Sequence, residues 1–278
     1  MQTIENEFFK VSVDEVGALL ASVISKKDGQ ELLWQKDPAF WPNQDVVIFP
    51  VIGFPEYDVE GKHYVCKTRH GFARTQKFVL KAKTEDSVTL ELKENPETLE
   101  VYPFAFLLDT TLTLKGNRLI RTVKVTNKSA KPLPFALGLH QAFKTKYDGS
   151  ASIHFDKAPT TYYPLREGWI KAPEKSIYHQ DEVLTKALWK DNETWVLPDD
   201  QHYQIDVKTG FGYTLKLRFD APEIAIWSQG KGGDFLCVEP WWGFSGYEGM
   251  PKEISERRDE NVIRKEKMFT LEIQIDKD

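Results

Sequence analysis

The 278-residue sequence contains only two cysteines, Cys66 and Cys237, which stand far apart and belong to no Cys-x-x-Cys pair. Disulfide-stabilised domains and zinc sites space their cysteines in recognisable pairs, so this scarcity argues against both classes. We therefore predict two reduced thiols in a cytoplasmic protein that has no metal site.

Long apolar runs and clusters of one charge are also missing. No uninterrupted apolar stretch approaches the ~18 residues of a membrane span. Residues 1–7 lack the basic start and apolar run of a secretory signal. The net charge is −5, and Lys and Arg are scattered along the chain. Neither a membrane nor a nucleic acid is therefore the expected partner.

Several catalytic signatures are absent as well. The sequence has no Gly-x-Ser-x-Gly, no His-Glu-x-x-His, no phosphate-binding P-loop and no Gly-x-Gly-x-x-Gly opening a helix. These absences argue against nucleophile-elbow hydrolases, zinc proteases, P-loop enzymes and dinucleotide-binding enzymes. No cofactor is expected.

Strand-like segments fill almost the whole chain. The stretches 108–114 and 119–125 alternate apolar with polar residues around Lys115-Gly116-Asn117, which predicts a hairpin with one solvent-facing side. Further strands are predicted at 7–13, 19–25, 31–34, 46–50, 78–82, 87–92, 135–140, 152–155, 202–207, 214–219, 223–227, 235–238 and 268–275. Helical periodicity is weak, and only residues 182–190 suggest a short helix.

Many short strands without βαβ alternation are typical of an all-β sandwich of two large antiparallel sheets. The chain shows no linker and no low-complexity segment, which predicts one domain over residues 1–278. The charged run 252–267 is expected to be a solvated loop before the last strand.

The most informative stretch runs from Asp234 to Phe244. Phe235–Val238 predicts a buried strand, Glu239 follows it, and Pro240 is expected to end the ladder because it has no N–H. Burial beside Trp241 should raise the pKa of the Glu239 carboxyl toward neutrality, as suits a general base. Aromatic faces also pack against the C–H faces of sugars. A structural ion pair with an arginine is the competing interpretation.

Two further segments carry candidate acid–base groups. In Arg69-His-Gly-Phe-Ala-Arg74, Gly71 permits a sharp bend that can direct His70 and Arg74 into one pocket. The apolar run that begins at Phe135 ends in His140. A histidine and a glutamate at two strand ends form a plausible acid–base couple, although a histidine alone is often structural.

Two other site types can be built from the same residues. His70, His140 and Glu239 could form a two-histidine, one-carboxylate metal site. Such sites usually show a His-x-Asp/Glu pair, which is absent here. A glycosidase would need a second carboxylate, yet only Glu239 has a pocket-like aromatic setting.

Three short motifs occur in the order and rough spacing of a known family. His70-Gly-Phe-Ala-Arg74, Gly138-Leu-His140 and Cys237-Val-Glu-Pro-Trp241 resemble those of the aldose 1-epimerase (galactose mutarotase) family, and Ile48-Phe-Pro-Val-Ile-Gly53 resembles its early signature. The resemblance covers residues 8–275 and is greatest to the LacX-like branch. It implies a galactose-mutarotase-like β-supersandwich with an open sugar cleft and no metal.

The resemblance also implies roles for individual residues. Glu239 would be the general base that takes the proton of the anomeric hydroxyl, and His140 the general acid that protonates the ring oxygen. His70 would bind near the ring oxygen or C1, and Arg74 would bind sugar hydroxyls or a carboxylate. The substrate would be an aldose or an aldose phosphate, acted on by a monomer or homodimer.

The sequence departs from the family pattern near Gly53. Phe54 stands where relatives of this branch commonly have an arginine, whereas Arg69 is an additional cation that could replace it or meet a phosphate. An acidic sugar contact is weakly matched by Asp191. Three hypotheses follow: a mutarotase, a non-catalytic carbohydrate-binding protein with the same fold, and a glycoside-processing enzyme.

Overall fold

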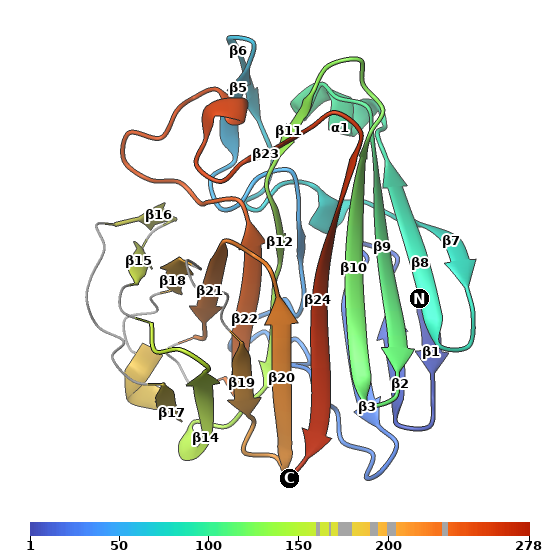
Figure 1. Ribbon diagram of the computed structural model, residues 1–278, viewed down its shortest axis with the longest axis vertical. Coiled ribbons are helices and arrows are strands. Elements are labelled where there is room, and N and C mark those ends of the chain that lie inside the picture. Colours follow the sequence, from blue (N-terminus) through green and yellow to red (C-terminus); the bar gives the residue numbers. More distant parts are fainter. Residues whose placement is uncertain (160–161, 167, 172–179, 190–193, 199–203, 230–232) are drawn as a thin grey trace.

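The computed structural model describes residues 1–278 except 160–161, 167, 172–179, 190–193, 199–203 and 230–232. Two large antiparallel sheets dominate the described residues (Figure 1). The nine-stranded sheet has the spatial order β17 (Asp181–Thr185), β14 (Asp148–Phe155), β19 (Ile205–Lys208), β20 (Tyr213–Phe219), β24 (Glu266–Lys277), β10 (Arg118–Asn127), β9 (Phe106–Lys115), β8 (Ser87–Lys93) and β7 (Val79–Lys83).

The second large sheet carries the site described below. Its order is β16 (Trp169–Ile170), β15 (Tyr163–Arg166), β18 (Thr194–Pro198), β21 (Glu223–Trp227), β22 (Phe235–Trp242), β12 (Leu137–Leu139) and β4 (Val47–Ile48), and β13 (Gln141–Lys144) also pairs with β22. The predicted all-β class with two large antiparallel sheets is confirmed.

Smaller elements complete the described part of the chain. The remaining strands are β1 (Gln2–Glu5), β2 (Phe9–Val13) and β3 (Leu20–Ser25) in one sheet, the pair β5 (Glu56–Val59) and β6 (Lys62–Val65), and the pair β11 (Leu133–Phe135) and β23 (Asn261–Ile263). The helices are α1 (Pro96–Val101) and the 3₁₀ turns η1 (Ala73–Thr75), η2 (Lys186–Trp189) and η3 (Ile254–Glu256). No helix among the described residues is long and apolar enough to cross a membrane.

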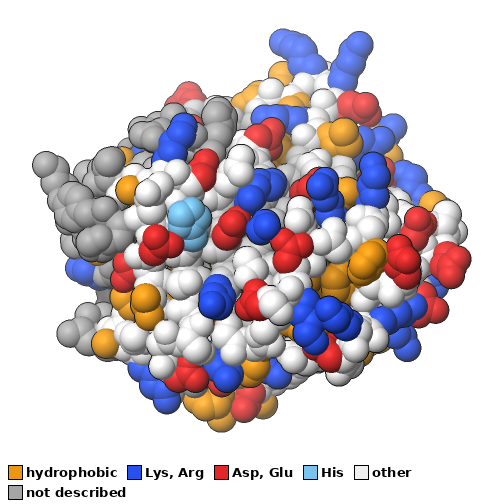
Figure 2. All heavy atoms as spheres, turned by 60° about the horizontal axis from the view of Figure 1, so that its bottom comes forward, with side chains coloured by type: hydrophobic (Ala, Val, Ile, Leu, Met, Phe, Trp, Pro, Cys, Tyr) orange, Lys and Arg blue, Asp and Glu red, His pale blue; other side chains and the backbone are white. Residues whose placement is uncertain are grey.

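Apolar side chains alternate with polar ones along the strands, and the apolar ones form the main core between the two sheets. Leu271 and Ile273 of β24 enter the same apolar cluster as Val238 of β22 and Ile226 of β21. The predicted hairpin of β9 and β10 is present, with Lys115 paired to Arg118. On the face in Figure 2, acidic and basic side chains are interspersed, in keeping with the scattered charge of the sequence.

Four predictions of local structure require correction. The helix expected at 182–190 is instead strand β17 followed by the 3₁₀ turn η2. Pairing of Ser152, Ile153 and His154 with residues 181–183 outweighs the weak helical pattern. The strand expected at 135–140 is divided between β11 and β12. The helix α1 was not anticipated, although Asn95 caps it and Pro96 begins it.

The charged run 252–267 is not simply a solvated loop. It contains η3 and β23, and Ile254 is fully buried within it. Arg258 donates to the buried carboxyl of Glu223 at 2.8 Å. The fourth correction concerns Pro240, which does not end its strand, because β22 continues to Trp242.

Candidate active site

Strand β22 presents two different faces. Leu236, Val238 and Trp242 enter the core between the sheets. Because side chains alternate along a strand, Cys237, Glu239 and Trp241 lie on the opposite face. There Trp241 packs in a separate apolar cluster, and Glu239 is only 2% exposed. The carboxyl of Glu239 is therefore buried outside the main core.

Pro240 changes the ladder without ending it. On one side, Pro240 remains paired with Ile224 of β21. On the other side, the ladder is interrupted between β13 and β12, and the register places His140 opposite Glu239. The N–H and C=O of His140 bond instead to Val46, at N···O distances of 3.0 and 3.2 Å. His140 and Glu239 thus form a non-hydrogen-bonded cross-strand pair, the type that brings side chains closest.

The two side chains of this pair are in contact. His140 Nε2 lies 3.2 Å from Glu239 Oε1. Burial raises the pKa of the Glu239 carboxyl well above its usual range and lowers the pKa of His140 well below its own. Both shifts favour a pair that carries one proton and no net charge. The indole N–H of Trp241 donates to Glu239 Oε2 at 3.1 Å and opposes the rise in pKa.

Aromatic rings fix the orientation of the His140 imidazole. Trp41 stacks on it with centroids 5.2 Å apart and 19° between the planes. Trp227 meets it edge-on at 6.1 Å. Neither tryptophan was assigned a role from the sequence, which placed Trp227 only at the end of the predicted strand 223–227. Both were recognisable as aromatic residues but not as neighbours of His140.

The second histidine enters the site from a tight loop. His70 has a left-handed backbone, with φ of +66°. At Gly71, φ is +72°, and a Cβ atom there would lie 2.1 Å from the carbonyl oxygen of Phe49. Glycine is therefore required for the bend that the sequence predicted. The His70 and His140 rings lie 6.0 Å apart, nearly perpendicular.

Hydrogen bonding determines the tautomer of His70. The N–H of Gly53 donates to His70 Nδ1 at 3.3 Å. Burial, with smaller contributions from the charges of Arg74 and Arg69, lowers the pKa of His70 to about 3. The ring is therefore neutral near pH 7, and its proton is on Nε2. His70 can donate one hydrogen bond from that atom.

Arginine and lysine side chains form the polar side of the cleft. Arg74, from η1, is half-buried, and burial lowers the pKa of its guanidinium. Arg69 reaches the β15–β16 turn, where a Cβ on Gly168 would lie 3.0 Å from Arg69 Nη2. Arg166 and Lys171 also line this cleft. Arg166 ends β15 and Lys171 follows β16, and the sequence around them gave no recognisable signal.

The cleft has a volume of about 780 Å³, within the ~300–1,000 Å³ typical of small-molecule sites. Of the seven predicted site residues, six line it: Arg69, His70, Arg74, His140, Glu239 and Trp241. Asp191 lies outside the described residues. Among the described lining residues, Glu239 is the only carboxylate, so the part of the cleft that is described does not supply the second carboxylate of a glycosidase.

One group of side chains could hold a cation. Ligand atoms of His140, Cys237 and Glu239 all lie within 4.8 Å of one another. However, burial raises the pKa of the Cys237 thiol as well as that of Glu239. Both would have to lose a proton before binding a metal, so this cluster favours protons over a cation.

The chain is similar to several known proteins, both in sequence and in structure. A family model described as Aldose 1-epimerase matches residues 1–252. The Lactococcus lactis subsp. lactis protein "Protein LacX, chromosomal" is 28% identical over 264 residues, which cover 87% of each chain. A galactose mutarotase related enzyme from Lactobacillus acidophilus is 28% identical with a TM-score of 0.92, over 99% of this chain and 97% of that one.

A galactose mutarotase-like protein from Lactobacillus casei ATCC 334 is 26% identical with a TM-score of 0.91, covering 99% of this chain and all of that one (100%). The predicted galactose-mutarotase-like fold is thereby confirmed, as is the family resemblance noted in the sequence.

Proposed function

Because the chain belongs to the aldose 1-epimerase family, and because His140 Nε2 lies 3.2 Å from Glu239 Oε1 in a buried cleft, we propose that it interconverts the α and β anomers of an aldose. The reaction opens the sugar ring, lets the carbonyl end rotate and closes the ring on the other face. The contact between His140 and Glu239 is the observation that carries this proposal.

The single proton of the pair suits both halves of the reaction. Ring opening uses the form in which the proton of the pair is on His140. The Glu239 carboxylate takes the proton of the anomeric hydroxyl while His140 gives its proton to the ring oxygen. The pair then consists of a carboxylic acid and a neutral imidazole. Ring closure reverses both transfers, so the net charge of the buried pair never changes. Each positioned group of this kind typically contributes roughly 10²–10⁴-fold.

Other residues of the cleft position the sugar. The Nε2–H of neutral His70 donates to the ring oxygen or to the oxygen on C1. The half-buried guanidinium of Arg74 has no ion-pair partner among the described residues, and it donates to sugar hydroxyls. Trp241 lines the cleft and also donates to Glu239 Oε2. Only 1% of Trp241 is exposed, so its part in the site is to steady the base through this hydrogen bond.

Among the described lining residues, cations outnumber carboxylates, which favours an aldose phosphate over a neutral aldose. Arg69, Arg74, Arg166 and Lys171 line the cleft, against the single described carboxylate of Glu239. Arginine forks match phosphate oxygens well. We place the phosphate nearest Arg69, the cation that the sequence already distinguished.

Exchange between anomers, followed by NMR saturation transfer, tests the proposal. A panel of aldoses and their 6-phosphates should include at least one sugar whose exchange the wild-type protein accelerates. Arg69→Ala should remove any preference for the phosphate while leaving exchange of the free aldose. Exchange no faster than in buffer for the whole panel would refute the proposal. Calorimetric binding without exchange would identify a non-catalytic carbohydrate-binding protein instead.

A further inference from the structure

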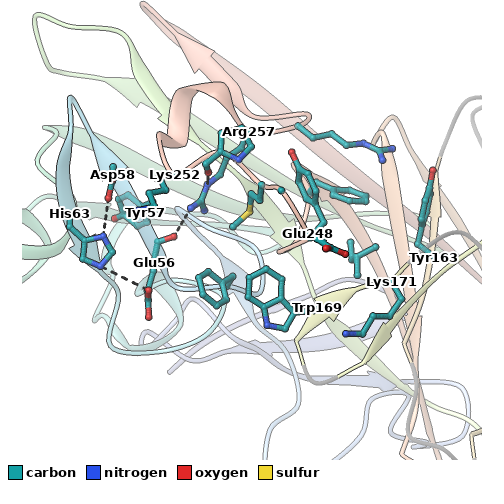
Figure 3. Close-up of a pocket in the computed structure, with 18 residues that line it drawn as sticks. Glu56, Tyr57, Asp58, His63, Tyr163, Trp169, Lys171, Glu248, Lys252 and Arg257 are labelled. Atoms are coloured by element: carbon teal, nitrogen blue, oxygen red, sulfur yellow. Dashed lines mark hydrogen bonds and ion pairs between the residues drawn. The ribbon is translucent and has the colours of Figure 1, made fainter.

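A second cavity, of about 990 Å³, adjoins the catalytic cleft. Figure 3 shows Trp169 in the middle of its lining, with Glu56 and His63 to one side and Lys171 and Tyr163 to the other. The wall between the two spaces is the segment 168–171. Gly168 lines the cleft, Trp169 and Ile170 line the second cavity, and Lys171 lines both.

This wall is anchored to the body of the sheet. The N–H of Ile170 donates to the carbonyl oxygen of Gly246 at 2.8 Å. Phe54 and Trp169 pack together with ring centroids 4.6 Å apart. A Cβ on Gly246 would lie 3.0 Å from Phe54 Cβ and 3.4 Å from Trp169 Cε3. The absence of a side chain at Gly246 therefore lets these two rings pack at the cavity surface.

The cavity surface is aromatic but not closed. Phe54, Tyr163, Trp169 and Tyr247 are each only partly buried, so ring surface remains available to a ligand. Phe54 stands where relatives of this branch commonly have an arginine, and here its ring packs on Trp169. Phe54 is part of this second surface, and it is not among the described residues that line the catalytic cleft.

Charged groups around these rings have mixed sign. Glu56, Asp58 and Glu248 supply carboxylates, and Lys171, Lys252 and Arg257 supply cations. Arg258 also lines the cavity, and its guanidinium lies 4.0 Å from the Phe244 ring centroid. This guanidinium already donates to Glu223 at 2.8 Å and to Asp259 at 3.0 Å. Hydrogen-bond donors and acceptors together with partly exposed rings suit a neutral polyhydroxylated ligand better than an anion.

We propose that this cavity is a subsite for a second sugar ring, belonging to an oligosaccharide whose reducing-end ring occupies the catalytic cleft. The inference rests on the proposed function and names its substrate class more closely. The second ring stacks on Phe54 and Trp169, and Lys171 lies at the junction of the two rings. Among neutral sugars, the preferred substrates are then reducing disaccharides or longer chains.

The test compares anomer exchange of monosaccharides with that of reducing disaccharides built from them, such as glucose with maltose and cellobiose, and galactose or glucose with lactose. For at least one disaccharide, the wild-type KM should be about 10-fold lower than for the monosaccharide at its reducing end, the size expected of one ring contact. Phe54→Ala and Trp169→Ala should remove this advantage without changing KM for the monosaccharide.

Two further variants sharpen the result. Phe54→Leu retains apolar volume but loses the aromatic face, so it should resemble Phe54→Ala if stacking is the interaction. Phe8→Ala removes an exposed ring outside this cavity, 42% exposed, and should change neither KM. Equal wild-type KM values for mono- and disaccharides, or an equal effect of Phe54→Ala on both, would overturn the subsite.

Failure of the subsite can be distinguished from failure of the proposed function. If neither these sugars nor the 6-phosphates exchange faster than in buffer, the proposed function fails. If only the phosphates do, the proposed function stands. In both cases calorimetry with the same disaccharides decides on the subsite. Binding to the wild type that is weakened about 10-fold by Phe54→Ala supports a sugar-binding cavity. Binding that Phe54→Ala leaves unchanged, or no binding at millimolar concentration, rejects it.

Discussion

At the scale of single residues, very few atoms control the proton shared by Glu239 and His140. Burial disfavours both charged forms, whereas the indole N–H of Trp241 favours the carboxylate. Trp241 reaches that oxygen because residues i and i+2 of a strand share a face. The neighbouring Trp242 points to the other face, where its indole N–H donates to Asp220 at 3.1 Å.

This difference between adjacent tryptophans gives a matched pair of variants. Trp241→Phe removes the donor to Glu239 and should lower kcat about 10-fold or more, since a hydrogen bond to a charged group is worth about 1.5–3 kcal/mol. Trp242→Phe removes a similar bond on the core side and should leave kcat near the wild-type value. Equal losses of kcat in the two variants, measured by NMR exchange, would argue against a specific role for the Trp241 donor.

At the scale of elements, the loop before η1 and the strand β22 bring together groups that are remote in the sequence. Gly71 allows the close approach of residues 70–71 to Phe49 on the chain leading out of β4. That approach positions His70 beside His140, whose own backbone bonds to Val46 just before β4. One short segment around β4 thus supports both histidines.

Substitutions at two glycines distinguish the cost of a left-handed backbone from the cost of a steric clash between the new Cβ and a neighbouring residue. Gly71→Ala introduces a left-handed alanine and also a Cβ against Phe49. Gly61→Ala introduces only the former, because Gly61 has φ of +76° but no atom within 4 Å of its built Cβ. Gly61→Ala should cost about 1–2 kcal/mol of unfolding free energy. Gly71→Ala should cost more and should also raise KM.

Urea denaturation and anomer exchange measure these two effects. If Gly71→Ala were no less stable than Gly61→Ala and had an unchanged KM, the loop would not be what positions His70.

The elements also show what sequence reasoning can reach. Regular alternation predicted the hairpin of β9 and β10, because alternate residues of these strands are buried. The strand predicted at 223–227 has the bounds of β21, although every residue but Trp227 is buried there. It did not predict that β22 continues through Pro240. The missing N–H of Pro240 falls on the side where the ladder is interrupted, while pairing with Ile224 continues on the other side. Which side a proline faces depends on register, and register is a property of the assembled sheet.

In the candidate site too, some residues could be predicted from the sequence and others only from the fold. Sequence reasoning identified His140 and Glu239 because each follows an apolar run, and His70 because of the bend that Gly71 permits and the resemblance to the family motif. Trp41 and Trp227 were not assigned to the site, because their contact with His140 depends on three segments folding together. Arg166 and Lys171 were missed for the same reason.

At the scale of the whole molecule, one buried ion pair joins the two large sheets near the site. Arg121 of β10 donates to both carboxylate oxygens of Asp45 at 2.9 and 2.8 Å. Asp45 precedes Val46, which bonds to the backbone of His140. The pair therefore links the nine-stranded sheet to the segment that supports the acid–base couple.

Removal of one partner should destabilise the fold strongly. Arg121→Met leaves the Asp45 charge buried without compensation, which typically costs about 3–5 kcal/mol. Arg118→Met on the same strand removes a half-exposed pair with Glu272 and should cost about 1 kcal/mol or less. Urea unfolding of both variants measures the difference. A similar small cost for both would mean that the buried pair does not hold the sheets together.

Buried carboxyls should also make stability depend on pH. Burial raises the pKa of Glu223 from its ordinary value of 4.5 to about 8, even though Arg258 lies against it. The folded state therefore binds a proton more tightly than the unfolded state does. The resulting contribution to stability is complete below about pH 4.5 and is lost as pH rises toward 8.

The urea midpoint should accordingly fall between pH 5 and pH 8.5, and Glu223→Gln should make this fall smaller because glutamine does not titrate. The variant also removes one of the two carboxylates that contact Arg258, leaving Asp259 at 3.0 Å, so its baseline stability is lower while its dependence on pH is weaker. Glu248→Gln, at an exposed position, should follow the wild-type curve. An identical slope for wild type and Glu223→Gln would contradict the assignment.

The most direct test of the acid–base couple is the anomer exchange rate of a sugar that the wild-type protein accelerates, compared with that of Glu239→Gln at equal concentration. Glutamine preserves the shape of the side chain but cannot take the anomeric proton. We expect the catalysed part of the rate to fall by about 10²-fold or more, while calorimetry still detects bound sugar. Exchange by Glu239→Gln at the wild-type rate would contradict the account.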